Sequence, residues 1–264
     1  MSKLQDRVAI VTGAGSIGPG WGNGKATAAA LAREGARVIA VDSREEAAEE
    51  TVRIIREEGG VCESFVADVS QADDIARLVD FTMQKFNRID ILHNNVGINR
   101  PAGTAELSES DWDLVMAVNL KSMFLTCKAV LPVMAEAGRG VILNVSSVAA
   151  IRYARIPYVV YSTSKGAVLA FTRTVALEYA SRGIRANSIL PGLLHTPMVF
   201  ASLGDTYAKS ADAIIAERNA QVPLGRMGTA WDVANAAVFL ASDDAGFITG
   251  AELVIDGGMS CSTG

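Results

Sequence analysis

Short apolar runs and longer segments with helical spacing alternate along the chain. Seven of the runs are rich in valine and isoleucine, which favours β-strands. These predicted strands are Val8–Val11, Val38–Val41, Val61–Ala67, Ile89–Leu92, Val141–Val145, Ile184–Leu190 and Leu253–Ile255. Because the runs are almost continuously apolar, they are typical of a sheet that is buried on both faces.

The segments between these runs predict helices. They are Lys25–Glu34, Arg44–Glu58, Gln71–Phe86, Glu109–Glu136, Val159–Ser181 and Ala230–Ala241, with a small lid helix at Thr206–Ala220. Alternating strands and helices predict a parallel sheet with right-handed crossovers and helices on both faces. No repeat, linker or composition shift marks a boundary. We therefore predict that residues 1–264 form a single α/β domain, a Rossmann-like doubly wound parallel β-sheet.

The charge balance is slightly acidic. The 264 residues include 24 Lys and Arg against 29 Asp and Glu, a net charge of −5. That balance offers no basic surface for a phosphate backbone, so no nucleic-acid partner is expected. The sequence has no signal-peptide core and no apolar run near the ~18 residues that span a bilayer. We expect a cytoplasmic protein with no membrane partner.

Cysteine and histidine are scarce. The three cysteines (Cys62, Cys127 and Cys261) are widely spaced, and the two histidines are His93 and His195. An odd number of cysteines without a C-x-x-C pair argues against a disulfide framework and against a zinc cage. No metal site is predicted.

A glycine-rich segment, Thr12–Gly24, follows the first predicted strand. A literal G-x-G-x-x-G falls on Gly13, Gly15 and Gly18, but the residues after Gly18 include a proline and two more glycines. The dinucleotide fingerprint needs its last glycine to open a helix whose amides hold a diphosphate. Gly24 meets that need, because a helix-like run starts directly after it. Taken alone, such a segment is equally typical of a flexible surface loop.

Asp42 strengthens the dinucleotide interpretation. It ends the second predicted strand, 18 residues after Gly24, close to the ~20-residue spacing of the acid that binds an adenosine ribose. An aspartate at a strand end is otherwise a common turn residue. Its coincidence with the glycine segment favours the ribose role and favours NAD, because a carboxylate would repel the 2′-phosphate of NADP. Lys25, Arg37 and Arg44 could offset part of that repulsion.

Tyr161 and Lys165 give the strongest chemical signal. Their spacing within a helix-like stretch puts the phenol and the ammonium on one helix face. A tyrosine with its ordinary pKa of about 10 is a poor acid–base catalyst at neutral pH, and a neighbouring cation lowers that pKa. Ser147, at the end of a predicted strand, could donate to a developing alkoxide. By itself, the same spacing also occurs in exposed helix pairs.

Further motifs follow the glycine segment in order. They are Asp68-Val69, Asn94-Asn95-Val96-Gly97, Asn119, Ser147, Tyr161 with Lys165, Pro191-Gly192 and Asp256-Gly257-Gly258. In these motifs the chain resembles the short-chain dehydrogenases/reductases of the Y-x-x-x-K type, and the resemblance covers nearly the whole sequence. It implies a Rossmann fold and NAD(P)-dependent transfer of a hydride to or from a secondary alcohol or ketone.

The resemblance implies catalytic roles for Asn119, Ser147, Tyr161 and Lys165. Tyr161 would be the general acid–base, and Ser147 would orient the substrate oxygen. Lys165 would hold the nicotinamide ribose and depress the pKa of Tyr161. Asn119 would anchor a water that relays the proton toward solvent. This complete set argues against an alternative function as a non-catalytic nucleotide-binding regulator.

The resemblance also implies a cofactor site, which we assign to NAD (NAD⁺/NADH). Its residues would be Gly13, Ser16, Asn23, Gly24, Asp42, Asp68, Val69, Asn95, Gly97, Tyr161, Lys165, Pro191, Gly192 and Thr196. Asp68 and Val69 would line the adenine, and Asn95 with Gly97 would pass beneath the adenosine ribose. Pro191, Gly192 and Thr196 would meet the nicotinamide carboxamide.

Two departures from the family pattern stand out. The glycine segment is longer than the usual one, with Ile17–Trp21 as the insertion, so the resemblance does not set its path over the diphosphate. The interval from Ser147 to Tyr161 is also one residue longer than usual, which affects the intervening loop at Arg152–Pro157.

The segments Ile98–Gly103, Val148–Tyr158 and Thr196–Gln221 should select the substrate. Their apolar side chains lie beside arginines, including Arg152 and Arg155, so an apolar or a carboxylated small-molecule alcohol or ketone is compatible with them. An NADP-dependent biosynthetic ketoreductase is the alternative enzyme. The resemblance implies a homotetramer, and NAD use favours alcohol oxidation.

Overall fold

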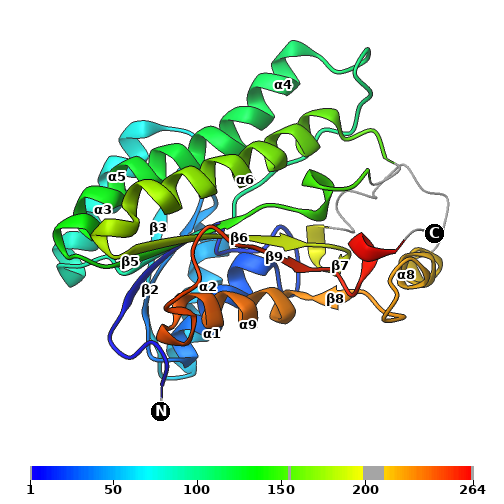
Figure 1. Cartoon of the computed structure of the whole chain (residues 1–264). Helices are drawn as coiled ribbons and strands as arrows, with labels where there is room; N and C mark the ends of the chain where they lie inside the picture. The colour runs from blue at the N-terminus through cyan, green and yellow to red at the C-terminus, as the bar shows by residue number, and fades with distance from the viewer. Residues whose placement is uncertain (1, 154–155, 199–210, 263–264) are drawn as a thin grey trace.

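A seven-stranded parallel sheet forms the centre of the molecule in this computed structural model, which describes residues 2–153, 156–198 and 211–262 (Figure 1). Its strands are β1 (Val8–Thr12), β2 (Arg37–Asp42), β3 (Val61–Val66), β4 (Ile91–Asn94), β5 (Gly140–Val145), β6 (Ile184–Pro191) and β9 (Glu252–Ile255). They lie in the order β3-β2-β1-β4-β5-β6-β9. All seven predicted strands are present, which confirms the doubly wound fold.

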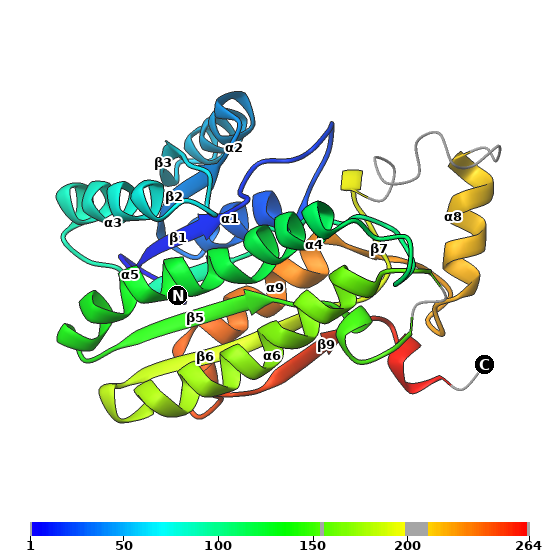
Figure 2. The ribbon, with the colours of Figure 1, turned by 90° about the horizontal axis from the view of Figure 1, so that it is seen from above.

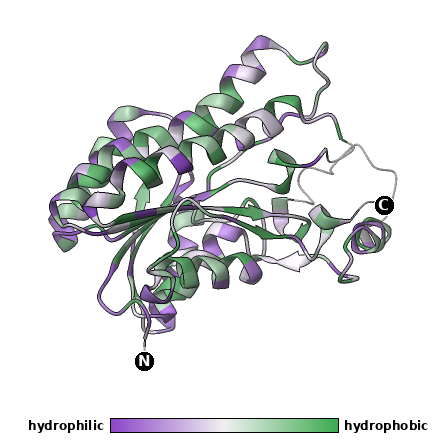
Figure 3. Ribbon diagram, viewed as in Figure 1, coloured by the Kyte–Doolittle hydropathy of each residue, from purple (hydrophilic) through white to green (hydrophobic). Residues whose placement is uncertain are grey.

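Helices cover both faces of this sheet (Figures 1 and 2). One layer holds α1 (Asn23–Arg33), α2 (Glu45–Glu57) and α9 (Ala230–Ala241), and the other holds α3 (Ala72–Phe86), α4 (Glu109–Met116), α5 (Ser122–Glu136) and α6 (Val159–Tyr179). Alternate residues of each strand point into the two layers, so Val11 and Ile10 belong to different apolar clusters. Hydrophobic residues accordingly concentrate in the strands and along the helices that flank them (Figure 3).

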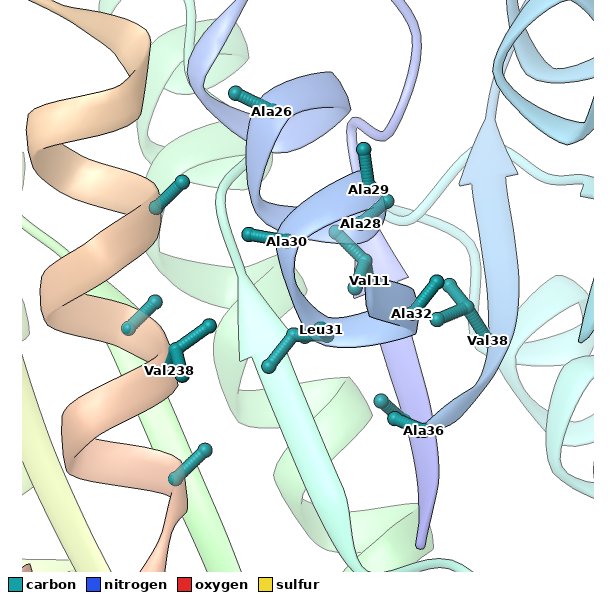
Figure 4. Packing of buried hydrophobic residues seen from close by; sticks show 14 of the residues in the cluster. Val11, Ala26, Ala28, Ala29, Ala30, Leu31, Ala32, Ala36, Val38 and Val238 are labelled. Carbon is teal, nitrogen blue, oxygen red and sulfur yellow. The ribbon is translucent and has the colours of Figure 1, made fainter. Parts of the chain in front are cut away.

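The packing of α1 against α9 depends on small side chains. The buried residues of α1 include Ala26, Ala28 and Ala30, and those of α9 include Ala234 and Ala237 (Figure 4). Alanines allow two helix backbones to approach closely, and they carry little side-chain entropy. This packing fixes α1 over the sheet, with its N-terminus directed at the carboxyl end of the neighbouring strands.

The predicted helix at Glu109–Glu136 is interrupted by a π-helical turn. The structure divides it into α4, the turn Ala117–Lys121, and α5. By length and composition this continuous stretch is long and apolar enough to cross a membrane. Here it packs on α3 and α6, and some of its apolar side chains, among them Met123, Cys127 and Val130, are buried in the core.

Sequence analysis missed a small parallel pair, β7 (Leu194–His195) with β8 (Gly228–Thr229). Two-residue strands are too short for a periodic pattern to reveal. The predicted lid helix is present as α8 (Ala211–Ala220), and its expected first part, 206–210, lies outside the described residues.

Candidate active site

The carboxyl ends of three central strands bring the predicted motifs together. Thr12 of β1 pairs with Asn94 of β4, which pairs in turn with Asn144 of β5. The chain order reverses between β1 and β4, and such a switch point is where doubly wound sheets bind their ligands. The glycine segment and the segments after Asn94 and Asn144 therefore start side by side at one sheet edge.

The glycine segment enters α1 in the predicted register. Gly22 is the N-cap of α1, so Gly24 lies in its first turn while Gly18 lies in the loop. A Cβ on Gly24 would stand 1.9 Å from the carbonyl oxygen of Gly13, which only glycine avoids. The Asn95 Nδ2 amide donates to the same carbonyl at 3.1 Å. Asn95 thus fixes the segment that the resemblance assigns to the cofactor.

The N-terminus of α1 fits an anionic group. Its first turn has no acidic residue to repel an anion. Unsatisfied amides and the helix dipole favour a negative charge at this position. These features suit the diphosphate of a nicotinamide dinucleotide, which Ser16, Asn23 and Gly24 would hold.

Asp42 lies beside the glycine segment at the end of β2. Its Oδ2 accepts the Gly15 amide at 3.0 Å and its Oδ1 accepts the Arg44 amide at 3.1 Å. Only 13% of the Asp42 side chain is exposed. A Cβ on Gly15 would approach Oδ2 to 2.7 Å, so a glycine is required for this contact.

The other predicted cofactor residues lie around the same edge. Asp68 and the buried Val69 follow β3, and Asp68 Oδ1 accepts the Ser70 amide at 2.9 Å. Pro191 ends β6, and the Gly192 amide donates to the Ile255 carbonyl at 2.9 Å. The buried Thr196 follows β7.

Lys165 is a buried cation at this edge, with 3% exposure. Its Nζ donates to the Val145 carbonyl at 2.8 Å, and a Cβ on Gly97 would stand 3.1 Å from that Nζ. Burial lowers the pKa of Lys165 to about 8. The Ser146 hydroxyl donates to the Lys165 carbonyl at 2.7 Å and so ties this turn of α6 to β5.

The acidity of Tyr161 in the protein alone is governed mainly by burial. Burial raises the pKa of Tyr161 above its usual value, the hydrogen bond with Ser147 lowers it, and Tyr158 raises it. Lys165 Nζ lies 5.8 Å from the Tyr161 ring centre, so it is near the phenol. Burial is the largest of these causes, because removing the phenolate from water disfavours the charged form. The lowering of the Tyr161 pKa by Lys165 stays a prediction.

Asn119 lies in the π-helical turn and is fully buried. Its Oδ1 accepts the Ile98 amide at 2.8 Å, and its Nδ2 donates to the Ile98 carbonyl at 3.0 Å. Nδ2 also lies 3.1 Å from the Ser164 hydroxyl, which donates to the Tyr161 carbonyl at 2.8 Å. Asn119 thus joins the segment after β4 to the helix that carries Tyr161 and Lys165.

Sequence analysis missed the positioning residues Ser146 and Ser164, and it placed Asn99 and Tyr158 only within substrate-selecting segments. Ser146 and Ser164 position α6, and Tyr158 lies edge-on to Tyr161 with ring centres 5.8 Å apart. The buried Oδ1 of Asn99 has no hydrogen-bond partner among the described residues. Their only sequence signal was proximity to the predicted motifs.

The arginines of the predicted substrate segments are tied to the protein. Arg152 Nε donates to the Ser260 carbonyl at 2.8 Å, and Arg100 pairs with Asp111 at 3.3 Å. Arg155, a candidate for binding an anionic substrate, lies outside the described residues.

Comparisons with known proteins agree with this geometry. Residues 18–260 match the family described as Enoyl-(Acyl carrier protein) reductase. The chain is 41% identical over 263 residues to a 2-(R)-hydroxypropyl-CoM dehydrogenase from Xanthobacter autotrophicus, covering 95% of this chain and 97% of the relative. The chain belongs to the short-chain dehydrogenase/reductase family.

Solved structures of this family match over the full length. A short-chain dehydrogenase/reductase from Burkholderia xenovorans shares 44% identity with a TM-score of 0.96, covering 100% of both chains. A gluconate 5-dehydrogenase from Burkholderia cenocepacia, solved with NADP and tartrate, shares 32% identity with a TM-score of 0.87, covering 99% of both. The protein is therefore an oxidoreductase that uses a nicotinamide cofactor on an alcohol or ketone.

Proposed function

We propose that this enzyme is an NAD(H)-dependent dehydrogenase of small secondary alcohols, working mainly in the oxidative direction. The observation that carries the NAD assignment is the Asp42 carboxylate, held beside the Gly15 amide at the end of β2. Such a carboxylate accepts hydrogen bonds from the two ribose hydroxyls, and these are stronger than bonds to a neutral acceptor. A 2′-phosphate would meet repulsion of ~4 kcal/mol for one pair of unit charges ~4 Å apart at an effective dielectric near 20.

Two of the three candidate cations, Lys25 and Arg37, are engaged elsewhere, which supports the same assignment. Lys25 pairs with Glu50 at 2.8 Å, and Arg37 pairs with Asp6 at 2.8 Å at the opposite end of β2. Arg44 Nη2 donates to the Ser16 carbonyl, and its Nε lies 4.0 Å from Asp42 Oδ1. Of these three cations, Arg44 is the one placed to reduce the repulsion between Asp42 and a 2′-phosphate.

The proposed chemistry assigns one task to each polar group. The bound nicotinamide ring accepts or supplies the hydride. Tyr161 exchanges a proton with the substrate oxygen, and the Ser147 hydroxyl donates to that oxygen as negative charge develops on it. Lys165 holds the nicotinamide ribose. As a cation, it also favours the phenolate of Tyr161 once the cofactor and the substrate are bound. Asn119 keeps the loop after β4 and α6 in one arrangement.

An NADP-dependent ketoreductase is the second candidate. The half-exposed Arg44 guanidinium beside Asp42 favours it, because it could turn toward a 2′-phosphate. The gluconate 5-dehydrogenase relative was solved with NADP.

We also propose a cytoplasmic homotetramer.

A panel of secondary alcohols and ketones tests the proposed function. Each would be assayed at 340 nm with NAD⁺ or NADH and with NADP⁺ or NADPH. We expect turnover of at least one alcohol with kcat/KM at least tenfold higher for NAD⁺ than for NADP⁺. A preference for NADP⁺ would favour the ketoreductase and overturn the role of Asp42.

A further inference from the structure

The insertion Ile17–Trp21 follows a defined path out of the glycine segment. It starts after Ser16, whose hydroxyl donates to the Gly18 carbonyl at 2.7 Å and whose own carbonyl accepts from Arg44. It returns at Gly22, the N-cap of α1. Both ends of the insertion therefore lie at the proposed diphosphate site.

The returning end is anchored by Trp21. Its ring centre lies 4.7 Å from that of Trp231 at the start of α9. Lys25 Nζ lies 5.2 Å from the Trp21 ring, and only 4% of the Lys25 side chain is exposed. Aromatic pairing and a cation over the ring each favour this indole position. Trp21 therefore holds an otherwise glycine-rich loop against two helices.

The tip of the insertion faces Pro197, which follows Thr196. A Cβ on Gly18 would lie 3.8 Å from Pro197 Cβ, and one on Gly20 would lie 3.6 Å from Pro197 Cγ. Gly20 has a φ of +108°, a conformation that favours glycine. Ile17 is 54% exposed, so the insertion does not enter the core.

We propose that Ile17–Trp21 is a cofactor strap, which closes against Pro197 over the bound dinucleotide and slows its release, with Trp21 as its positioning residue. The strap starts at the diphosphate end of the site and reaches the residue after Thr196, which is assigned to the nicotinamide end. It therefore spans the two halves of the cofactor. Gly18 and Gly20 lie beside Pro197 with no side chain of their own to fill the space between them, so the strap can move away to admit the dinucleotide. The proposal rests on the proposed cofactor site.

A reversible disulfide tests the closure of the strap. The Gly18→Cys/Pro197→Cys variant, built on Cys261→Ser to remove the exposed thiol, has a Cβ separation within the ~3.5–4.5 Å range of disulfides. After oxidation with NADH bound, NADH dissociation, followed by fluorescence during displacement with excess NAD⁺, should be at least tenfold slower than after reduction with dithiothreitol. Equal rates in both states, with the disulfide verified by mass spectrometry, would overturn the strap.

Substitutions at Trp21 test its positioning role independently. Trp21→Ala should speed NADH dissociation at least fivefold and raise acrylamide quenching of bound NADH, while Trp21→Phe should restore most of the wild-type rate. Trp112→Ala, which removes a partly exposed tryptophan of α4, is the matched control and should leave both readouts unchanged. Unchanged dissociation in Trp21→Ala would contradict the role of Trp21.

The direct binding readout separates this proposal from the proposed function. Wild-type NADH binding is measured before any variant. If neither NADH nor NADPH binds the wild type, the proposed function fails. If the dinucleotide binds with a dissociation rate that neither the disulfide nor Trp21→Ala changes, only the strap fails.

Discussion

Asp42 acts by accepting hydrogen bonds and by repelling a second anion. Removing its carboxylate loses both effects, so Asp42→Ala should shrink the ratio of kcat/KM for NAD⁺ over NADP⁺. We expect a wild-type ratio of at least tenfold, equivalent to ~1.4 kcal/mol. Steady-state kinetics with one alcohol and both cofactors gives the ratio directly. An unchanged ratio in Asp42→Ala would assign cofactor choice to another residue.

Lys165 makes the stability of the folded protein depend on pH. Its pKa is about 8 when folded against 10.5 in the unfolded chain, so between these values the unfolded state binds more protons. The free energy of unfolding should therefore rise with pH across this window, by up to roughly 3 kcal/mol. Lys165→Met lacks this titration, so its stability relative to wild type should be highest at pH 7 and decline toward pH 10.

Urea unfolding at pH 7, 8, 9 and 10 checks this expectation. The control is Lys128→Met, which replaces an exposed lysine of α5 and should run parallel to wild type. If the Lys165→Met and wild-type profiles also run parallel, the buried ammonium does not destabilise the fold.

The sequence predicted the residues whose role follows from their spacing along the chain. It failed for residues whose chemistry depends on how deeply the folded protein buries them. The register of Gly24 followed from the need for a glycine at the helix start, and the structure confirms that Gly24 lies in the first turn of α1, which begins at Asn23. The pKa direction of Tyr161 could not be predicted, because it depends on how far the surrounding fold buries the phenol and on the nearby Tyr158. The roles of Ser146 and Ser164 likewise exist only once α6 lies against β5 and the π-helical turn.

At the scale of elements, a buried polar ladder ties the catalytic helices to the sheet. Thr126 of α5 donates to Asn94 Oδ1, Asn94 donates to Asn144 Oδ1, and Asn144 donates to Thr172 of α6, each at 2.9 Å. Asn144→Ala would leave Asn94 and Thr172 short of a buried partner, at a cost of roughly 2–3 kcal/mol. Thermal or urea unfolding measures this loss.

The matched control for the ladder is Thr163→Ala on the same helix. The Thr163 hydroxyl is exposed and donates to the Val159 carbonyl at 2.7 Å, so its removal should change stability by less than ~0.5 kcal/mol. Equal small losses in both variants would mean that the ladder does not stabilise the fold.

Continuous apolar runs made the strands predictable, whereas two features of the elements depended on tertiary contacts. The π-helical turn at Ala117–Lys121 coincides with the bonds between Asn119 and Ile98, which link residues far apart in sequence. The insertion path depends on the tilted ring contact between Trp21 and Trp231, a long-range contact. Periodicity carries no information about either.

At the scale of the whole molecule, large apolar side chains remain exposed on two faces. Leu177 of α6 is 78% exposed and Phe124 of α5 is 48% exposed, and Phe239 of α9 and Phe247 near the edge strand β9 are also exposed. Exposed apolar patches and an open sheet edge favour association. We expect a homotetramer with dihedral symmetry, and sedimentation equilibrium at micromolar concentration measures it. A monomer mass would contradict this expectation.

The central claim is that Tyr161 transfers the proton in hydride exchange with a nicotinamide cofactor. Tyr161→Phe keeps the ring and removes only the hydroxyl, so it tests this claim most directly. We predict that kcat on the substrate identified by the panel falls by ~10²–10⁴-fold. The Kd for NADH, measured by fluorescence, should stay within about threefold of wild type, because the proposed cofactor contacts of Lys165 and Asp42 are unchanged. A Tyr161→Phe enzyme that retains wild-type kcat would contradict the account.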